Sequence, residues 1–151
     1  MTDILGLFSR TQKRLRAASD EAMSRHGVRV GQNVLLELLW ENDGLTPGAV
    51  ARALGVATPT VVKSAARMEA GGLITKRRDE HDARLVRLYL TERGRAVHEP
   101  VQQARRELEE RVTATLTEQE RVHLRSALGK MYEQLAGQGA GDPAEDAAED
   151  G

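Results

Sequence analysis

The sequence predicts a mainly α-helical protein that carries one small β-hairpin, an α+β fold class. Residues 45–71 show two short helical patterns separated by Gly55, and residues 73–90 show two apolar strand patterns around a charged tip. A long helical pattern begins after Thr91. Two short helices followed by such a hairpin form a winged helix-turn-helix. Helices at both ends of the chain are expected to build a dimerisation region.

Two helices are predicted before this motif. The first runs from Asp3 to about His26, and the second from about Gly31 to Asn42. The residues expected on the buried face of the second helix are Val34, Leu35, Leu38 and Leu39. The apolar stripe of the first helix has no obvious partner within a small three-helix core and consists of Leu5, Phe8, Leu15 and Ala22.

The helix-turn-helix is predicted from two similar helix starts. Thr46 places a capping hydroxyl before Pro47, which needs no hydrogen-bond donor at the first helical position. Thr58 and Pro59 are expected to repeat this start after the sharp turn at Gly55. The second helix should run to about residue 71, and its inward residues are expected to be Val61, Ala65 and Met68.

The outward face of that second helix is short-chained, hydroxylated and cationic. It consists of Thr58, Thr60, Val62, Lys63, Ala66 and Arg67. Such a face suits the major groove of DNA, where Thr and Val meet the thymine methyl and Lys or Arg reach guanine acceptors. The alternative is a solvated helix with few acids, since Glu69 is the only acid between Gly55 and Lys76. The candidates for reading bases are Thr60, Val62, Lys63 and Arg67.

The hairpin supplies a second candidate DNA contact. One strand begins at Leu73 and runs into Arg78, and the other alternates with Val86, Leu88 and Leu90 on one face. Residues 79–84 form the tip between them. An arginine on a projecting tip suits a narrow, electronegative minor groove. The alternative is an ordinary polar hairpin loop.

Three motifs resemble the MarR family of bacterial transcriptional regulators. They are Asp82-Ala83-Arg84, Leu90-Thr91-Glu92-Arg93-Gly94, and Met68-Glu69-Ala70-Gly71-Gly72-Leu73-Ile74. The resemblance covers roughly Leu5 to Leu135. It implies that Arg84 enters the minor groove and that Asp82 pairs with a nearby arginine. Ala83 departs from the charged residue that the family often has there.

Two more helices are predicted after the hairpin. Thr91 should cap the first of them, and Pro100 should bend it near residues 96–100. The last helix should open with the capping box of residues 117–120 and carry an apolar stripe of Leu124, Leu128, Met131 and Leu135. The terminal helices have more apolar surface than one winged helix covers, which favours a homodimer over an intramolecular bundle.

The sequence therefore predicts four regions. Residues 1–44 are N-terminal helices for dimerisation and core, and residues 45–91 are the DNA-binding winged helix-turn-helix. Residues 92–136 are C-terminal dimerisation helices, and residues 137–151 are a disordered acidic tail. The net charge of −1 is an average over this tail and a basic body. Residues 45–98 hold ten basic and five acidic side chains, whereas the only charges after Leu135 are five acids.

Composition argues against an enzyme or a membrane protein. The four histidines have no metal-ligand spacing, and neither a phosphate-binding loop nor a nucleophile motif occurs, so no cofactor is expected. The chain has no cysteine, which excludes the branch of the resembled family that senses oxidants through a thiol. Without a signal sequence or a membrane-length apolar run, a cytoplasmic protein is expected.

The predicted function is that of a double-stranded-DNA-binding transcriptional regulator, a repressor that binds a pseudo-palindromic operator as a homodimer. Its two recognition helices should enter major grooves about 34 Å apart. The expected DNA-binding residues are Thr58, Thr60, Val62, Lys63, Arg67, Arg77, Asp82 and Arg84. The alternative is a winged-helix module that binds protein and exposes a large apolar patch.

The resemblance further implies a small aromatic or phenolic acid as effector. Such a ligand would lie in a cleft between the dimerisation helices and the DNA-reading lobe. Cationic or aromatic side chains expected to border this cleft are Arg14, His26, Arg29, Trp40, Arg95 and His98.

Overall fold

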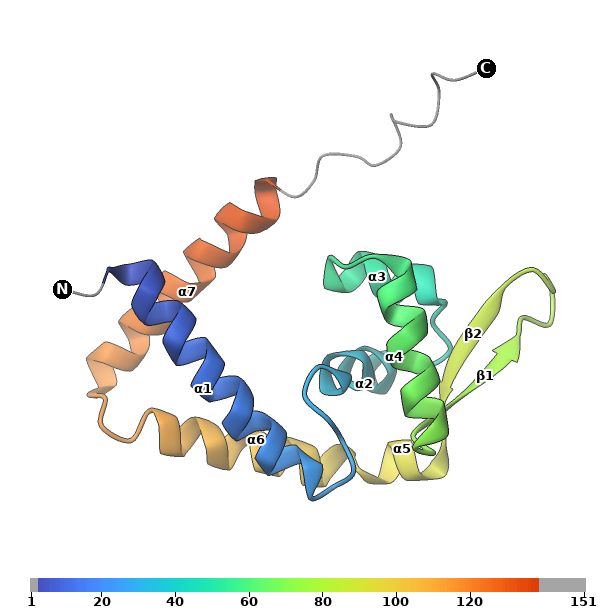
Figure 1. Cartoon of the computed structure of the whole chain (residues 1–151), viewed down its shortest axis with the longest axis horizontal. Helices are drawn as coiled ribbons and strands as arrows, with labels where there is room; N and C mark the ends of the chain where they lie inside the picture. The colour runs from blue at the N-terminus through green and yellow to red at the C-terminus, as the bar shows by residue number, and fades with distance from the viewer. Residues whose placement is uncertain (1–2, 139–151) are drawn as a thin grey trace, which may run out of the picture. The chain divides into compact units, whose positions relative to one another are not determined.

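The computed structural model describes residues 3–138 (Figure 1). The chain divides into two compact units, Met1–Arg111 and Val112–Gly151, and each is described by itself. The first unit contains α1 (Ile4–Ser24), α2 (Gln32–Glu41), α3 (Pro47–Leu54), α4 (Thr58–Ala70), β1 (Ile74–Arg78), β2 (Val86–Leu90), α5 (Glu92–Ala96) and nearly all of α6 (His98–Val112). The second unit contains α7 (Glu118–Gln138).

The predicted winged helix-turn-helix is confirmed within the first unit. Helices α2, α3 and α4 gather beside the hairpin, and α5 follows β2 directly (Figure 1). The strands β1 and β2 pair antiparallel, with Ile74 opposite Leu90 and Arg78 opposite Val86. A short bridge from Leu45 to Leu88 ties the start of the helix-turn-helix to β2.

The core of this unit is mainly aliphatic. It is formed by α2, the helix-turn-helix and one face of the hairpin, with Met23 from α1 and Val101 from α6. Val61, Ala65 and Met68 of α4 are buried as expected, as are Leu88 and Leu90 of β2. Burial of these side chains places α4 on the core and leaves its opposite face in solvent.

One prediction about α2 is wrong. Val34 was expected in the core but is 39% exposed, whereas Leu36 is fully buried beside Leu35 and Leu39. Apolar residues occupy four of the five positions from Val34 to Leu38, with Glu37 the polar exception. Helical periodicity therefore does not decide which side of α2 faces the core.

The predicted capping residues are confirmed at α3 and α5 but not at α4. Thr46 accepts a hydrogen bond from the Ala49 amide, and Thr91 accepts one from the Gly94 amide. Helix α4 instead has Ala57 at its cap position, and Thr58 is its first helical residue without a capping bond. The prediction failed because proline is also tolerated one residue further in, where its missing N–H would again have no partner.

The predicted bend near Pro100 is confirmed as a break between α5 and α6 at Val97. Pro100 lies in the first turn of α6, where a helix needs no amide donor. Val101, one residue later, is fully buried. The second part of the broken helix, α6, ends at Val112.

The second unit is described by α7 and the turn before it. The predicted capping box is confirmed, since the Thr117 amide donates to Glu120 Oε1 at 3.0 Å and the Glu120 amide donates to Thr117 Oγ1 at 3.1 Å. Helix α7 includes residues 137 and 138, where the acidic tail was expected to begin, and the rest of that tail lies outside the described residues. Among residues 3–138, no helix is long and apolar enough to span a membrane.

Candidate nucleic-acid interface

The outer face of α4 is the first part of the candidate interface. Its expected DNA-contacting residues, Thr58, Thr60, Val62, Lys63 and Arg67, are all exposed. Within residues 3–138, Lys63 and Arg67 have no ion-pair partner. This face therefore presents two uncompensated cations, two hydroxyls and one apolar side chain, and Val62 alone does not make a large apolar patch.

The tip of the hairpin is organised by the Asp79 carboxylate. Asp79 Oδ1 accepts hydrogen bonds from the amides of His81 at 2.8 Å and Asp82 at 2.9 Å. Its other oxygen, Oδ2, forms an ion pair with Arg87 Nε on β2. Arg87 and the two amides together lower the pKa of Asp79 to about 2. Asp79 therefore remains ionised at physiological pH.

Arg84, the expected minor-groove residue, projects from this tip. Its side chain is 90% exposed, and its Nε and Nη2 donate to the two carboxylate oxygens of Asp82 at 3.0 and 3.1 Å. The pairing of Asp82 with a nearby arginine is thus present in the structure, and it lowers the pKa of Asp82. The bidentate contact holds Arg84 in one orientation at the tip.

The outward face of the hairpin carries two arginines directly opposite each other. Arg77 on β1 is the register partner of Arg87 on β2. The Arg77 guanidinium lies 4.2 Å above the ring centroid of Tyr89. Arg87 pairs with Asp79 and also donates to the Gly44 carbonyl at 2.9 Å. These contacts offset the repulsion that two like charges would otherwise have across the strands.

The junction between α4 and β1 is held by side chains from both sides. Glu69 accepts a hydrogen bond from the Lys76 amide at 2.9 Å, and its other oxygen lies 3.7 Å from Lys76 Nζ. Thr91 donates to the Gly72 carbonyl at 2.6 Å, and Arg93 donates to the Gly71 carbonyl at 2.7 Å. Helix α4 and the β1–β2 hairpin, which is the wing of the motif, are therefore held together by local polar contacts.

Sequence reasoning missed Asp79, Arg87 and Glu69 as parts of this interface. The signal for Asp79 was present, because an aspartate at the start of a turn commonly bonds amides two and three residues later. The contacts of Arg87 could not be predicted in the same way. Arg87 lies eight residues after Asp79 and 43 residues after Gly44, so neither partner is a neighbour in the sequence. Pairing of β1 with β2 brings them together.

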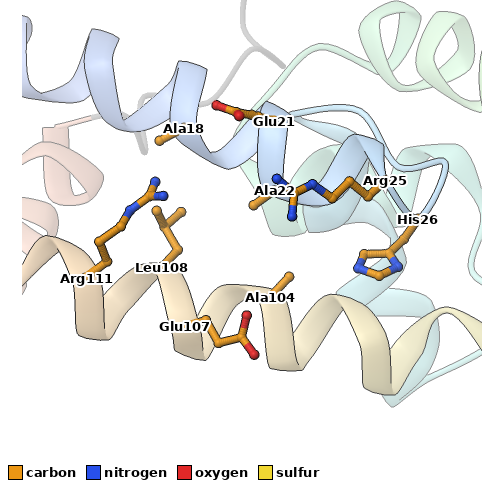
Figure 2. A pocket seen from close by; sticks show the side chains of 9 residues that line it. All are labelled: Ala18, Glu21, Ala22, Arg25, His26, Ala104, Glu107, Leu108 and Arg111. Carbon is orange, nitrogen blue, oxygen red and sulfur yellow. The ribbon is translucent and has the colours of Figure 1, made fainter.

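The predicted effector residues do not line a single cavity. A cavity of about 300 Å³ lies between α1 and α6 and includes His26 (Figure 2). Leu108 and Arg111 point from α6 toward α1 at this cavity (Figure 2). A second cavity, of about 260 Å³, is lined by Trp40 and His98, whose ring centroids are 4.5 Å apart.

The other three predicted effector residues line neither of these cavities. Arg29 pairs with Asp20 at 3.1 Å, and Arg95 donates to the Leu90 carbonyl at 3.1 Å. Arg14 is exposed on α1. Over the described part of the chain, no group of three or more His, Cys, Asp or Glu side chains is arranged to hold a metal ion.

Known proteins resemble this chain over about half of its length or more, and two of them resemble it over most of its length. The MarR family model matches residues 26–85. The HTH-type transcriptional regulator PecS of Dickeya dadantii (strain 3937) is 25% identical over 135 residues, which are 87% of this chain and 81% of PecS. The organic hydroperoxide resistance transcriptional regulator of Bacillus subtilis (strain 168) is 35% identical over 77 residues, 51% of this chain and 52% of that protein. The crystal structure of an S. aureus MepR–DNA complex aligns with a TM-score of 0.79 and 25% identity, covering 89% of this chain and 99% of the MepR chain.

Proposed function

Because this chain belongs to the MarR family of DNA-binding transcriptional regulators, we propose that it is a homodimeric repressor of a pseudo-palindromic operator. One observation carries the proposal. The same compact unit contains both the exposed cationic face of α4 and Arg84, which projects from the tip of the hairpin. Two such units related by a two-fold axis would read two half-sites, about one helical turn of DNA apart.

The proposed division of labour follows from exposure and charge. Thr60, Val62, Lys63 and Arg67 on α4 read base edges in the major groove, because short and cationic side chains match its donors, acceptors and methyl groups. Thr58 and Arg77 contact the sugar-phosphate backbone on either side. Arg84 enters the minor groove from the wing, and Asp82 orients it.

The proposed homodimer is supported by apolar side chains that the described structure leaves in solvent. On α1, Ile4 is 78% exposed and Leu5 is 72% exposed. On α7, Tyr132 is 72% exposed and Leu135 is 71% exposed. Burial of one large apolar side chain stabilises an association by about 1.5–3 kcal/mol. We therefore assign residues 1–44 and 92–136 to dimerisation and residues 45–91 to DNA.

Repression would be relieved by a small aromatic or phenolic acid. Two cavities of the first unit support this part of the proposal, because each combines a histidine with at least one arginine. A carboxylate would be recognised by a guanidinium and an aromatic ring by apolar or stacking surface. A thermal-shift screen of aromatic acids tests it, and no stabilisation at saturating concentrations would exclude these compounds as effectors.

Operator binding is tested by selecting duplexes from a random-sequence pool with the parent protein. The expected result is enrichment of an inverted repeat, and light scattering should give twice the mass of one chain. Fluorescence anisotropy at fixed salt should then show that Lys63→Ala and Arg84→Ala weaken binding of the selected duplex. Lys13→Ala, which removes an exposed cation from α1, is the matched control and should bind like the parent. Enrichment of no sequence, or of a single half-site, would refute the proposal.

A further inference from the structure

We infer that Asp79 is the positioning residue of the wing: it holds the tip in the shape that aims Arg84 at DNA. The inference rests on the proposed use of the wing in DNA binding. Asp79 contacts no base or phosphate in this scheme, and it acts through the backbone of the tip. Its role is therefore distinct from that of Arg84, which makes the contact, and of Asp82, which pairs with Arg84 directly.

The first argument is the number of bonds that meet at one carboxylate. Asp79 accepts from the amides of His81 and Asp82 and from the guanidinium of Arg87. Only 12% of its side chain is exposed, compared with 35% for Asp82 and 90% for Arg84. Asp79 is therefore the most enclosed of these three charged groups, and it fixes the backbone two residues before Arg84.

The second argument is that Asp79 connects the tip to the body of the motif. Its partner Arg87 also donates to the Gly44 carbonyl, in the turn between α2 and α3. Gly44 in turn donates to the Leu88 carbonyl at 3.0 Å, so Gly44 itself is hydrogen-bonded to β2 at two points. A continuous series of polar contacts thus runs from the tip through Asp79 and Arg87 to the base of the helix-turn-helix. Without Asp79 the tip would lose its anchor to this series.

The third argument concerns the sign of the expected effect. An acidic side chain beside DNA repels phosphates, so removing it should strengthen binding if charge alone mattered. Asp79 compensates Arg87, which otherwise faces Arg77 across the strands. Its removal would leave the Arg87 guanidinium without a carboxylate partner opposite Arg77 and would loosen the tip. If Asp79 positions the tip, its loss should weaken DNA binding. If it acts only through its charge, its loss should strengthen binding.

The test compares Asp79→Asn with Glu80→Gln in the full chain, using the duplex selected by the parent protein. Both variants remove one negative charge from the same tip and keep nearly the same size. Glu80 is exposed and takes no part in the contacts of Asp79 described above, whereas Asp79→Asn loses the ion pair with Arg87. We expect Asp79→Asn to weaken binding about tenfold, equivalent to ~1.4 kcal/mol. Glu80→Gln should bind as tightly as the parent or more tightly.

A double-mutant cycle with Arg84→Ala distinguishes positioning from a general loss of stability. If Asp79 acts through Arg84, Asp79→Asn should cost almost nothing further in the Arg84→Ala background. Equal losses in both backgrounds, unchanged or tighter binding by Asp79→Asn, or a variant unfolded at the assay temperature would each overturn the inference. A parent protein that selects no duplex would instead refute the proposed function. An Arg84→Ala variant with parental affinity would refute the proposed role of the wing.

Discussion

Gly94→Ala should destabilise the first unit strongly, because the added methyl group has no space. A Cβ on Gly94 would lie 2.1 Å from the Leu73 carbonyl oxygen and 3.2 Å from Leu90 Cδ2. The nearest atom belongs to the backbone, so no side-chain rotation relieves the clash. Helix α5 would have to move about 1 Å away from the segment that joins α4 to β1, because carbon and oxygen atoms need roughly 3.2 Å.

Such a movement would disturb two hydrogen bonds as well as the packing. Trp40 Nε1 donates to the Gly94 carbonyl at 2.9 Å, and the Thr91 amide donates to the Leu73 carbonyl at 3.1 Å. Overpacking costs about 1–3 kcal/mol and each weakened hydrogen bond about 1 kcal/mol. The free energy of unfolding should therefore fall by roughly 3–5 kcal/mol, which lowers the melting temperature by roughly 10 °C or more.

The matched control is Gly48→Ala in α3. A Cβ at Gly48 meets only the flexible Arg52 Nη1 at 3.7 Å, an ordinary contact distance. Alanine should therefore stabilise α3 by about 0.5–1 kcal/mol through its higher helix propensity. Thermal unfolding followed by circular dichroism compares the two variants with the parent. A Gly94→Ala protein that melts within about 2 °C of the parent would refute the close approach of α5 to Leu73.

Three further predictions concern the core, the wing and the charged face. Leu88→Ala should lower the free energy of unfolding by about 2–5 kcal/mol in urea titrations, because Leu88 is fully buried, while the exposed Leu85→Ala should change it little. Asp79 has a pKa of about 2 instead of 3.8, so the stability it contributes is complete above pH ~4 and is lost as the pH falls toward 2. The difference in melting temperature between the parent and Asp79→Asn should disappear over that pH range. A difference that persists near pH 2 would show that the ionised Asp79 carboxylate is not the source of this stability. Arg77→Gln should reduce the slope of log affinity against log salt by about 0.9, the value for one phosphate contact, and an unchanged slope means that Arg77 does not contact phosphate.

Local chemistry made most of the fold predictable. The capping residues Thr46, Thr91 and Thr117 and the break before Pro100 depend on neighbours within four residues, and all are present in the structure. The same local rules failed at Thr58, because they allow a helix with proline near its start to begin at either of two positions. They also failed for the face of α2, where the choice depends on which elements pack against it.

The candidate site was predictable only in part, for a related reason. The exposed face of α4 follows from helical periodicity once Val61, Ala65 and Met68 are buried. The support of the wing does not follow from periodicity, because Asp79 and Arg87 meet only after β1 and β2 pair in register. Similarly, Gly94 is recognisable in the sequence as part of the Leu90–Gly94 motif. The need for glycine there is not, because it comes from the backbone of Leu73, which belongs to another segment.

The basic residues of the proposed DNA-binding region are not equivalent, so their number alone does not measure its electrostatic attraction for DNA. Lys76, Arg84 and Arg87 already have carboxylate partners, whereas Lys63 and Arg67 have no ion-pair partner within the described chain. A cation that is compensated before binding releases fewer counterions when it meets a phosphate. The salt dependence of DNA binding should therefore be set mainly by cations without a carboxylate partner among the described residues, which include Arg77 on β1 as well as Lys63 and Arg67 on α4. The paired arginines of the wing contribute direction more than charge, so a count of basic residues alone overstates the electrostatic part of binding.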